Sequence, residues 1–168
     1  MKTKVWLLLL AFIVIIIACE DEEGENLNEV IPDELIGNWE AIITDGAIES
    51  KNTLTFTEDA FTMLFLEKDN NEWHVDEGVK GTFTVSGNEL TLTFTHFGFS
   101  DYDEVTQTYG DCIWYGSGTA EYDYMIEFCE GATFKAEYSV SGNQLTFKWD
   151  ENRDGIYSAD ETTVYVKV

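Results

Sequence analysis

The stretch Gly81 to Phe94, GTFTVSGNELTLTF, shows the pattern that decides the fold. Apolar residues alternate with threonines on both sides of Ser86-Gly87-Asn88-Glu89. A period of two indicates half-buried strands, and a Gly-Asn pair between two such runs readily supplies the positive φ of a tight turn. The stretch therefore predicts a β-hairpin. Residues 136–149, AEYSVSGNQLTFKW, repeat the arrangement and predict a second one.

The same alternation recurs in the rest of the chain, at residues 53–57, 61–63 and 164–168. No segment after Pro32 shows a sustained helical period, and Gly116–Thr119 has the composition of a further hairpin tip. About eight to ten short strands joined by such turns predict an all-β, antiparallel fold, either a barrel or a sandwich.

A resemblance to a known family favours the barrel. Leu35–Glu40, LIGNWE, resembles the opening strand of lipocalins, with Gly37 and Trp39 in the motif positions. Residues 53–63 and 81–94 resemble the lipocalin-like domains of small bacterial lipoproteins. The resemblance implies an up-and-down, lipocalin-like β-barrel over residues 34–168 that binds a ligand. Lipocalins carry an arginine that packs over the opening tryptophan. Here Lys148 or Lys167 would take its place, because the only arginine, Arg153, lies in an acidic loop.

The interior of such a barrel would be lined by the aromatic residues at alternating positions. These are Trp39, Phe56, Phe83, Phe94, Tyr138, Phe147 and Trp149. An eight-stranded barrel is either filled by its own side chains or holds one small apolar ligand, and the pattern alone leaves both open.

The first residues predict a location outside the cytoplasm. Residues 1–18 combine two lysines with a short apolar run, as a secretory signal peptide does. Ile16–Cys19 resembles the lipobox of bacterial lipoproteins, which implies cleavage before Cys19 and acylation of that cysteine. Residues 19–33 are rich in acids and predict a flexible tether. We expect an outer-membrane lipoprotein on the periplasmic face or the cell surface; an uncleaved N-terminal anchor is the alternative.

The charge of the chain excludes some partners. Removing residues 1–18 takes away two lysines and no acids, leaving seven basic against 33 acidic residues and a formal charge of −26. Such a surface repels nucleic acid and attracts metal ions or basic proteins. A second candidate function is therefore an acidic interaction protein or inhibitor that captures a cationic protein.

The cysteines predict one disulfide. With Cys19 lipidated, Cys112 and Cys129 remain as an even pair in an oxidising compartment. The expected hairpin at Gly116–Thr119 would place them on facing strands.

A stretch near the end of the chain, WDENRDGIYSADE at 149–161, fits the oxygen-donor spacing of a calcium loop. The expected ligands, in chain order, are Asp150, Asn152, Asp154, Ile156 through its carbonyl, Ser158 through a water, and Glu161. The alternative is an acidic hairpin turn without a bound ion. A calcium ion here would be structural.

No constellation of catalytic residues is found in the sequence. There is no Gly-x-Ser-x-Gly elbow, and His74 and His96 do not have the spacing of a zinc site. The sequence thus predicts a lipid-anchored, non-enzymatic, lipocalin-like protein that binds a small apolar ligand.

Overall fold

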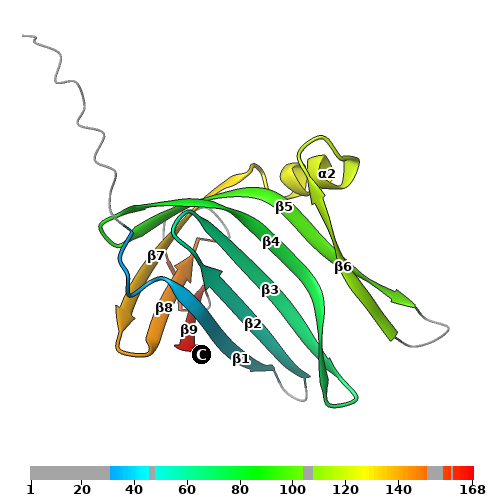
Figure 1. The fold of residues 1–168 in the computed structure, drawn as a ribbon, viewed down its shortest axis with the longest axis horizontal. Helices are drawn as coiled ribbons and strands as arrows, with labels where there is room; N and C mark the ends of the chain where they lie inside the picture. Colours follow the sequence, from blue (N-terminus) through cyan, green and yellow to red (C-terminus); the bar gives the residue numbers. More distant parts are fainter. Residues whose placement is uncertain (1–30, 46–47, 104–107, 151–156, 160) are drawn as a thin grey trace, which may run out of the picture.

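The computed structural model describes residues 31–45, 48–103, 108–150, 157–159 and 161–168. These residues form one antiparallel sheet and one helix (Figure 1). The strands are β1 (Gly37–Asp45), β2 (Ile48–Phe56), β3 (Ala60–Asp69), β4 (Glu72–Ser86), β5 (Glu89–Asp103), β6 (Thr108–Gly116), β7 (Thr133–Ser141), β8 (Gln144–Trp149) and β9 (Thr162–Lys167). The helix, α2 (Ala120–Phe128), joins β6 to β7.

The sheet closes into a ring. The strand order is β4-β3-β2-β1-β9-β8-β7-β5-β6, and β4 also pairs with β5. Two strands pair with the same edge of β5, one after the other: β7 pairs with residues 89–93, and β6 pairs with residues 96–103. Eight strands therefore form the ring, and β6 is an additional strand that projects away from it (Figure 1). The predicted all-β, antiparallel architecture is confirmed.

The tight turns follow from residues that tolerate positive φ. Gly87 and Gly142 have φ of 62° and 60°, each at the first position of a two-residue loop, as in type II′ turns. Both hairpins predicted from the sequence are thus confirmed. Asn70 and Asn71 have φ of 49° and 65° between β3 and β4, the pattern of a type I′ turn.

A β-bulge in β5 changes which residues face the interior. Lys80 pairs with His96 and Gly81 with Phe94, so Thr95 has no opposite residue. Before the bulge the even-numbered Leu90, Leu92 and Phe94 are buried; after it the odd-numbered Phe97 and Phe99 take over. A bulge inserts one residue and so reverses the alternation downstream.

The helix is a correction to the sequence analysis. The Gly116–Thr119 segment is not a hairpin tip: Gly118 has φ of 93°, and the Thr119 hydroxyl accepts a hydrogen bond from the backbone N–H of Tyr122 at 3.2 Å as the N-cap of α2. Apolar periodicity could not reveal a helix none of whose residues is fully buried. The cap was the available signal.

The predicted disulfide is not formed, because Cys112 and Cys129 are both thiols in the structure. The prediction placed them on facing strands, whereas Cys112 lies on β6 opposite Ser100 and Cys129 is the C-cap of α2. Burial raises the pKa of the Cys112 thiol, and the charge of Lys80 opposes that rise only in part.

Candidate functional site

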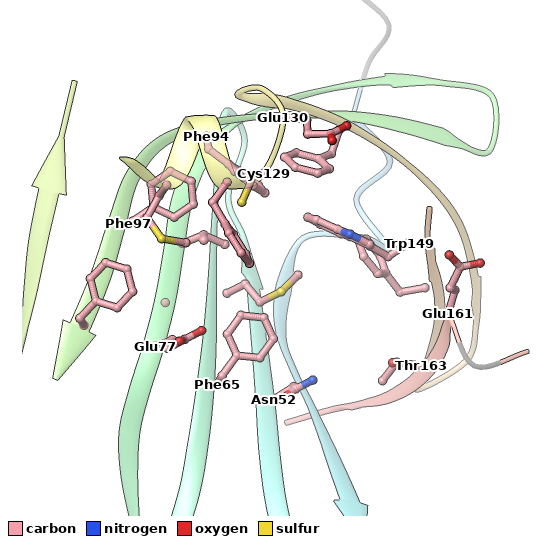
Figure 2. A pocket seen from close by; sticks show the side chains of 18 of the residues that line it. Asn52, Phe65, Glu77, Phe94, Phe97, Cys129, Glu130, Trp149, Glu161 and Thr163 are labelled. Carbon is pink, nitrogen blue, oxygen red and sulfur yellow. The ribbon is translucent and has the colours of Figure 1, made fainter. Parts of the chain in front are cut away.

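The interior of the ring contains a cavity of about 650 Å³ (Figure 2). Its walls come from β2, β3, β4, β5, β7, β8 and β9 and from the C-terminal part of α2. The residues that line it are Asn52, Met63, Phe65, Glu77, Gly78, Val79, Phe94, Phe97, Phe99, Met125, Phe128, Cys129, Glu130, Phe134, Phe147, Trp149, Glu161, Thr163 and Tyr165. The cavity has the size and the largely apolar lining of a small-molecule site.

Three stacked aromatic rings form the centre of one wall. The ring centroids of Phe94 and Phe134 are 4.7 Å apart, and the Trp149 ring lies 5.0 Å from Phe134 and 5.8 Å from Phe94. Their interplanar angles are between 15° and 26°. The three rings belong to β5, β7 and β8, so the closure of the ring between β5 and β7 brings them together.

The helix contributes Met125, Phe128 and Cys129 to the cavity. It is held against β5 by the Tyr122 hydroxyl, which donates a hydrogen bond to the carbonyl of Phe94 at 2.9 Å. Glu130 follows the C-cap in the left-handed region, with φ of 55°, a position at which glycine is preferred. Its side chain is exposed and also lines the cavity.

Glu77 is an acidic residue in an aromatic row. It lies on β4 opposite Phe65 of β3 and Phe99 of β5, and all three line the cavity. Burial raises the pKa of the Glu77 carboxyl, and the neighbouring charges of Asp76 and Glu67 raise it further. Each of these causes disfavours the ionised form, so Glu77 lacks a compensating positive charge.

Two further polar groups line the cavity: Tyr165 lies on β9, and Glu161 lies just before that strand. One Glu161 carboxylate oxygen accepts hydrogen bonds from the Ser158 backbone N–H at 2.9 Å and from the Ser158 hydroxyl at 2.6 Å. Burial raises the pKa of the Tyr165 phenol to about 12, although a hydrogen bond with the Asn52 side chain opposes the shift.

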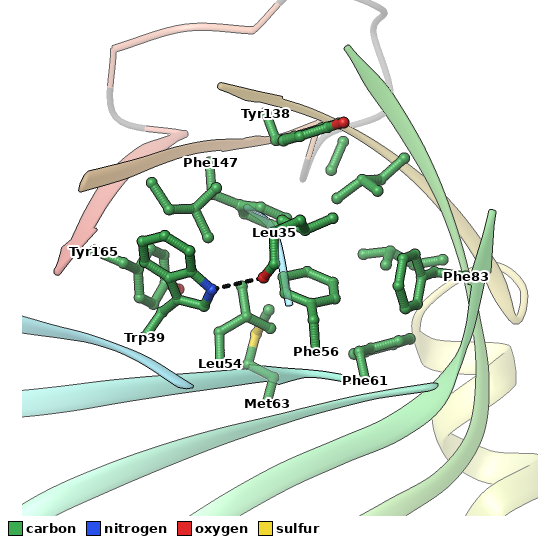
Figure 3. Close-up of a cluster of buried hydrophobic side chains, with 14 of the residues drawn as sticks. Leu35, Trp39, Leu54, Phe56, Phe61, Met63, Phe83, Tyr138, Phe147 and Tyr165 are labelled. Atoms are coloured by element: carbon green, nitrogen blue, oxygen red, sulfur yellow. Dashed lines mark hydrogen bonds between the residues drawn. The ribbon is translucent and has the colours of Figure 1, made fainter. Parts of the chain in front are cut away.

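The opposite end of the ring is filled by side chains (Figure 3). Leu35 and Trp39 are fully buried there, and the Trp39 indole N–H donates a hydrogen bond to the Leu35 carbonyl at 2.9 Å. The interior of the ring is therefore filled by side chains at this end and contains the cavity at the other. Six of the seven aromatic residues expected inside are buried, and Trp149 packs against them from the cavity wall.

Gly37 and Trp39 form a local arrangement with Lys167. The Lys167 ammonium lies 4.9 Å from the Trp39 ring centroid, so Lys167, rather than Lys148, packs over this tryptophan. Lys148 instead forms an ion pair with Glu137 at 3.1 Å. Gly37 has φ of 136°, a backbone conformation that residues with a side chain rarely adopt, so this position favours glycine.

The expected calcium loop is described only in part. Asp150, Ser158 and Glu161 are described, whereas Asn152, Asp154 and Ile156 lie outside the described residues. Within the described ranges, no three His, Cys, Asp or Glu side chains gather closely enough to hold a metal ion. The calcium loop stays a prediction.

The N-terminal segments also lie outside the described residues, which begin at residue 31; Cys19, the predicted signal peptide and most of the predicted tether precede them. In the residues from 31 onward that are described, no helix combines the length and apolar character needed to cross a membrane.

Sequence reasoning missed two of the three acidic residues that line the cavity, Glu77 and Glu130, and gave the third, Glu161, a different role as an expected calcium ligand. Glu77 is one acid among 33, and its position becomes informative only when the register places it between Phe65 and Phe99. Glu130 was missed together with α2. The sequence signal was the Glu130-Gly131 pair after the helix, because a glycine next to a helix end marks its termination.

Comparison with known proteins gives no relative for this chain. No protein-family model matches it, and no curated protein matches it significantly.

Proposed function

We propose that this protein binds a small, largely apolar ligand in the cavity of a lipocalin-like barrel. The single observation that carries the proposal is the cavity of about 650 Å³, lined mostly by aromatic and aliphatic side chains. Small-molecule sites have this size, this apolar lining and a few fixed polar groups. The proposal contains no catalytic step.

The proposal includes an anchor. The sequence supports cleavage before Cys19, acylation of that cysteine and an acidic tether over residues 19–33. Two or more acyl chains, at about 0.8 kcal/mol for each buried methylene, would hold the protein stably at a bilayer. The proposed location is the outer membrane, on its periplasmic face or at the cell surface. Mass spectrometry of the mature protein tests this; retention of residues 1–18 or absence of acyl mass would refute it.

Ligand binding can be tested with a neutral fluorescent probe, N-phenyl-1-naphthylamine, and two matched variants. Val79 on β4 lines the cavity, whereas Thr84 on the same strand is exposed. We expect Val79→Trp to occupy part of the cavity and lower probe affinity at least about tenfold, a loss of about 1.4 kcal/mol. Thr84→Trp should leave the affinity unchanged. Binding that is absent from the wild-type protein, or equal in both variants, would refute the proposal.

A second candidate function is supported by the distribution of basic residues. Each of the six lysines in the described ranges has its ammonium against a carboxylate or over a tryptophan ring. The many remaining acids favour capture of a cationic protein, as the sequence also predicts. Binding of a basic protein that weakens steeply with ionic strength, and equally in Val79→Trp, would support this function.

A further inference from the structure

The charged side chains that line the cavity, among the described residues, are all acidic. Among the described residues that line the cavity, three are glutamates and none is lysine, arginine or histidine. Lys51, Lys68 and Lys80 are instead held by rings and carboxylates, with Lys80 3.7 Å from the Trp114 ring centroid. A cavity with this balance of charge disfavours an anionic ligand.

The three glutamates do not gather at one point. Figure 2 shows Glu77, Glu130 and Glu161 on different sides of the cavity. They lie on β4, after α2 and just before β9, and they form no group that could hold a metal ion. Carboxylates arranged around an apolar space suit one larger organic cation better than a compact metal ion, which needs its oxygens within about 2.6 Å.

The surfaces between the carboxylates are also suited to a cation. The stacked rings of Phe94, Phe134 and Trp149 form part of the wall, and aromatic faces attract positive charge. Glu77 stands between Phe65 and Phe99 in one cross-strand row. Its carboxylate has no ion pair in the described part of the chain, and its neighbouring charges, Asp76 and Glu67, are both negative.

We propose that the ligand is an organic cation, an apolar amine whose ammonium group lies near Glu77 and whose body lies among the aromatic rings. This inference rests on the proposed binding function. Because the Glu77 carboxylate lies near the negative charges of Asp76 and Glu67, a ligand ammonium would offset the repulsion among these carboxylates. A neutral ligand of the same shape would obtain the apolar contacts alone.

Three probes of nearly equal shape test the inference: 1-naphthylmethylamine, which is cationic at pH 7.5, neutral 1-naphthalenemethanol, and anionic 1-naphthoate. Their affinities can be measured by calorimetry and by quenching of tryptophan fluorescence, since Trp149 lines the cavity. We expect the amine to bind about tenfold more tightly than the alcohol, and the alcohol more tightly than the naphthoate.

Two charge-matched variants separate the cavity from the general attraction of an acidic protein. Glu77→Gln removes a carboxylate from the cavity wall, and Glu58→Gln removes one from the exposed turn between β2 and β3 at the packed end. Glu77→Gln should abolish most of the preference for the amine over the alcohol. Glu58→Gln should change neither. Circular dichroism and melting temperature confirm that both variants fold.

The outcomes distinguish the inference from the proposed function. If the amine and the alcohol bind equally, or if Glu58→Gln lowers amine affinity as much as Glu77→Gln does, the inference is refuted and ligand binding stands. If none of the three probes binds, both proposals fall. A Val79→Trp protein that loses the alcohol and the amine together would locate both probes in the cavity.

Discussion

At the scale of single residues, Lys167 connects the last strand of the ring to the first. The register of β1 with β9 contains only two residue pairs, Trp39 with Lys167 and Glu40 with Val166. The Lys167 ammonium adds a contact with the Trp39 ring and a hydrogen bond to the Glu34 carbonyl at 3.2 Å. The side chain thus strengthens the shortest ladder of the ring.

We therefore expect Lys167→Ala to lower the free energy of unfolding by about 1–2 kcal/mol, the sum of a cation–π contact and a charged hydrogen bond. Urea denaturation followed by tryptophan fluorescence measures the change. The control is Lys135→Ala, which removes the same charge from an exposed ion pair with Glu89. A loss in the control as large as in Lys167→Ala would show that net charge, not the contact with Trp39, is responsible.

Glu77 makes stability depend on pH. Its pKa in the folded protein is above 4.5, so between 4.5 and that value the folded chain holds a proton that the unfolded chain has lost. Stability from this group is complete below 4.5 and is lost as pH rises through the folded pKa. Because glutamine does not ionise, the Glu77→Gln variant should not lose this stability as pH rises. The variant should gain stability relative to the wild type as pH rises above 4.5, measured by urea denaturation. A difference independent of pH would contradict the assignment.

At the scale of elements, a row of glycines lets β6 lie against the sheet. Leu64, Gly78, Gly98 and Trp114 are consecutive partners across β3, β4, β5 and β6. A Cβ atom at Gly98 would lie 2.6 Å from the Cys112 sulfur and 2.8 Å from the Trp114 ring. The indole therefore covers the two glycines, an arrangement that supports glycine within strands.

Gly98→Ala should push Trp114 and Cys112 outward and destabilise the protein by about 1–3 kcal/mol, the usual cost of overpacking. The matched control is Gly110→Ala on β6, where the closest atom to the added Cβ would be 3.3 Å away. A red shift of tryptophan emission in Gly98→Ala alone would accompany the loss. Equal stability of the two variants would show that the row adapts without cost.

The calcium site expected within residues 150–161 stays a prediction that melting experiments can test. With a dissociation constant of about 1 mM, 10 mM calcium would stabilise the folded protein by about 1.4 kcal/mol. The melting temperature should rise with calcium, and less with magnesium at equal ionic strength, and Asp150→Ala should abolish the difference. Identical melting curves in calcium and magnesium would identify the segment as a turn without an ion.

The elements differ in how far the sequence predicted them. Strands with apolar and threonine alternation were predictable, because a period of two is set by the backbone itself. The bulge at Thr95 was not, since the change from Phe94 to Phe97 and Phe99 becomes meaningful only with the β4 partner known. The helix was hidden because α2 has no fully buried face, and the missed helix also led to the wrong placement of Cys112 and Cys129 on facing strands.

At the scale of the whole molecule, charge opposes the compact state. The chain without residues 1–18 carries a formal charge of −26. Since the described lysines are already engaged, the remaining acids repel one another across the surface. The sequence predicted this balance fully, because net charge does not depend on the fold.

Sodium chloride at 0.5 M should therefore raise the melting temperature by about 3–6 °C, equivalent to about 1 kcal/mol, by screening this repulsion. Scanning calorimetry measures the shift, with a sugar at equal osmolality as the control. A melting temperature that falls with salt would mean that the ion pairs outweigh the repulsion.

The cavity could not be predicted from residue patterns. Met63 belongs to the packed core as well as to the cavity lining, and Phe65 continues the same alternation on β3 toward the open end. The alternation of apolar residues along a strand does not show where the side chains stop filling the interior and the cavity begins. The boundary between the packed interior and the cavity depends on where β5 stops pairing with β7 and begins to pair with β6, and on where α2 lies.

The two ends of the ring differ, because one is filled by side chains and the other contains the cavity. Residues 31–35 enter at the packed end, where Leu35 is fully buried, whereas the exposed lining residues Glu77, Phe128 and Glu130 lie at the other. A protein tethered upstream of Ile31 is held by its closed end. With the proposed lipidation and ligand binding, the proposed ligand would then exchange with the aqueous phase rather than be drawn from the acyl chains of the membrane.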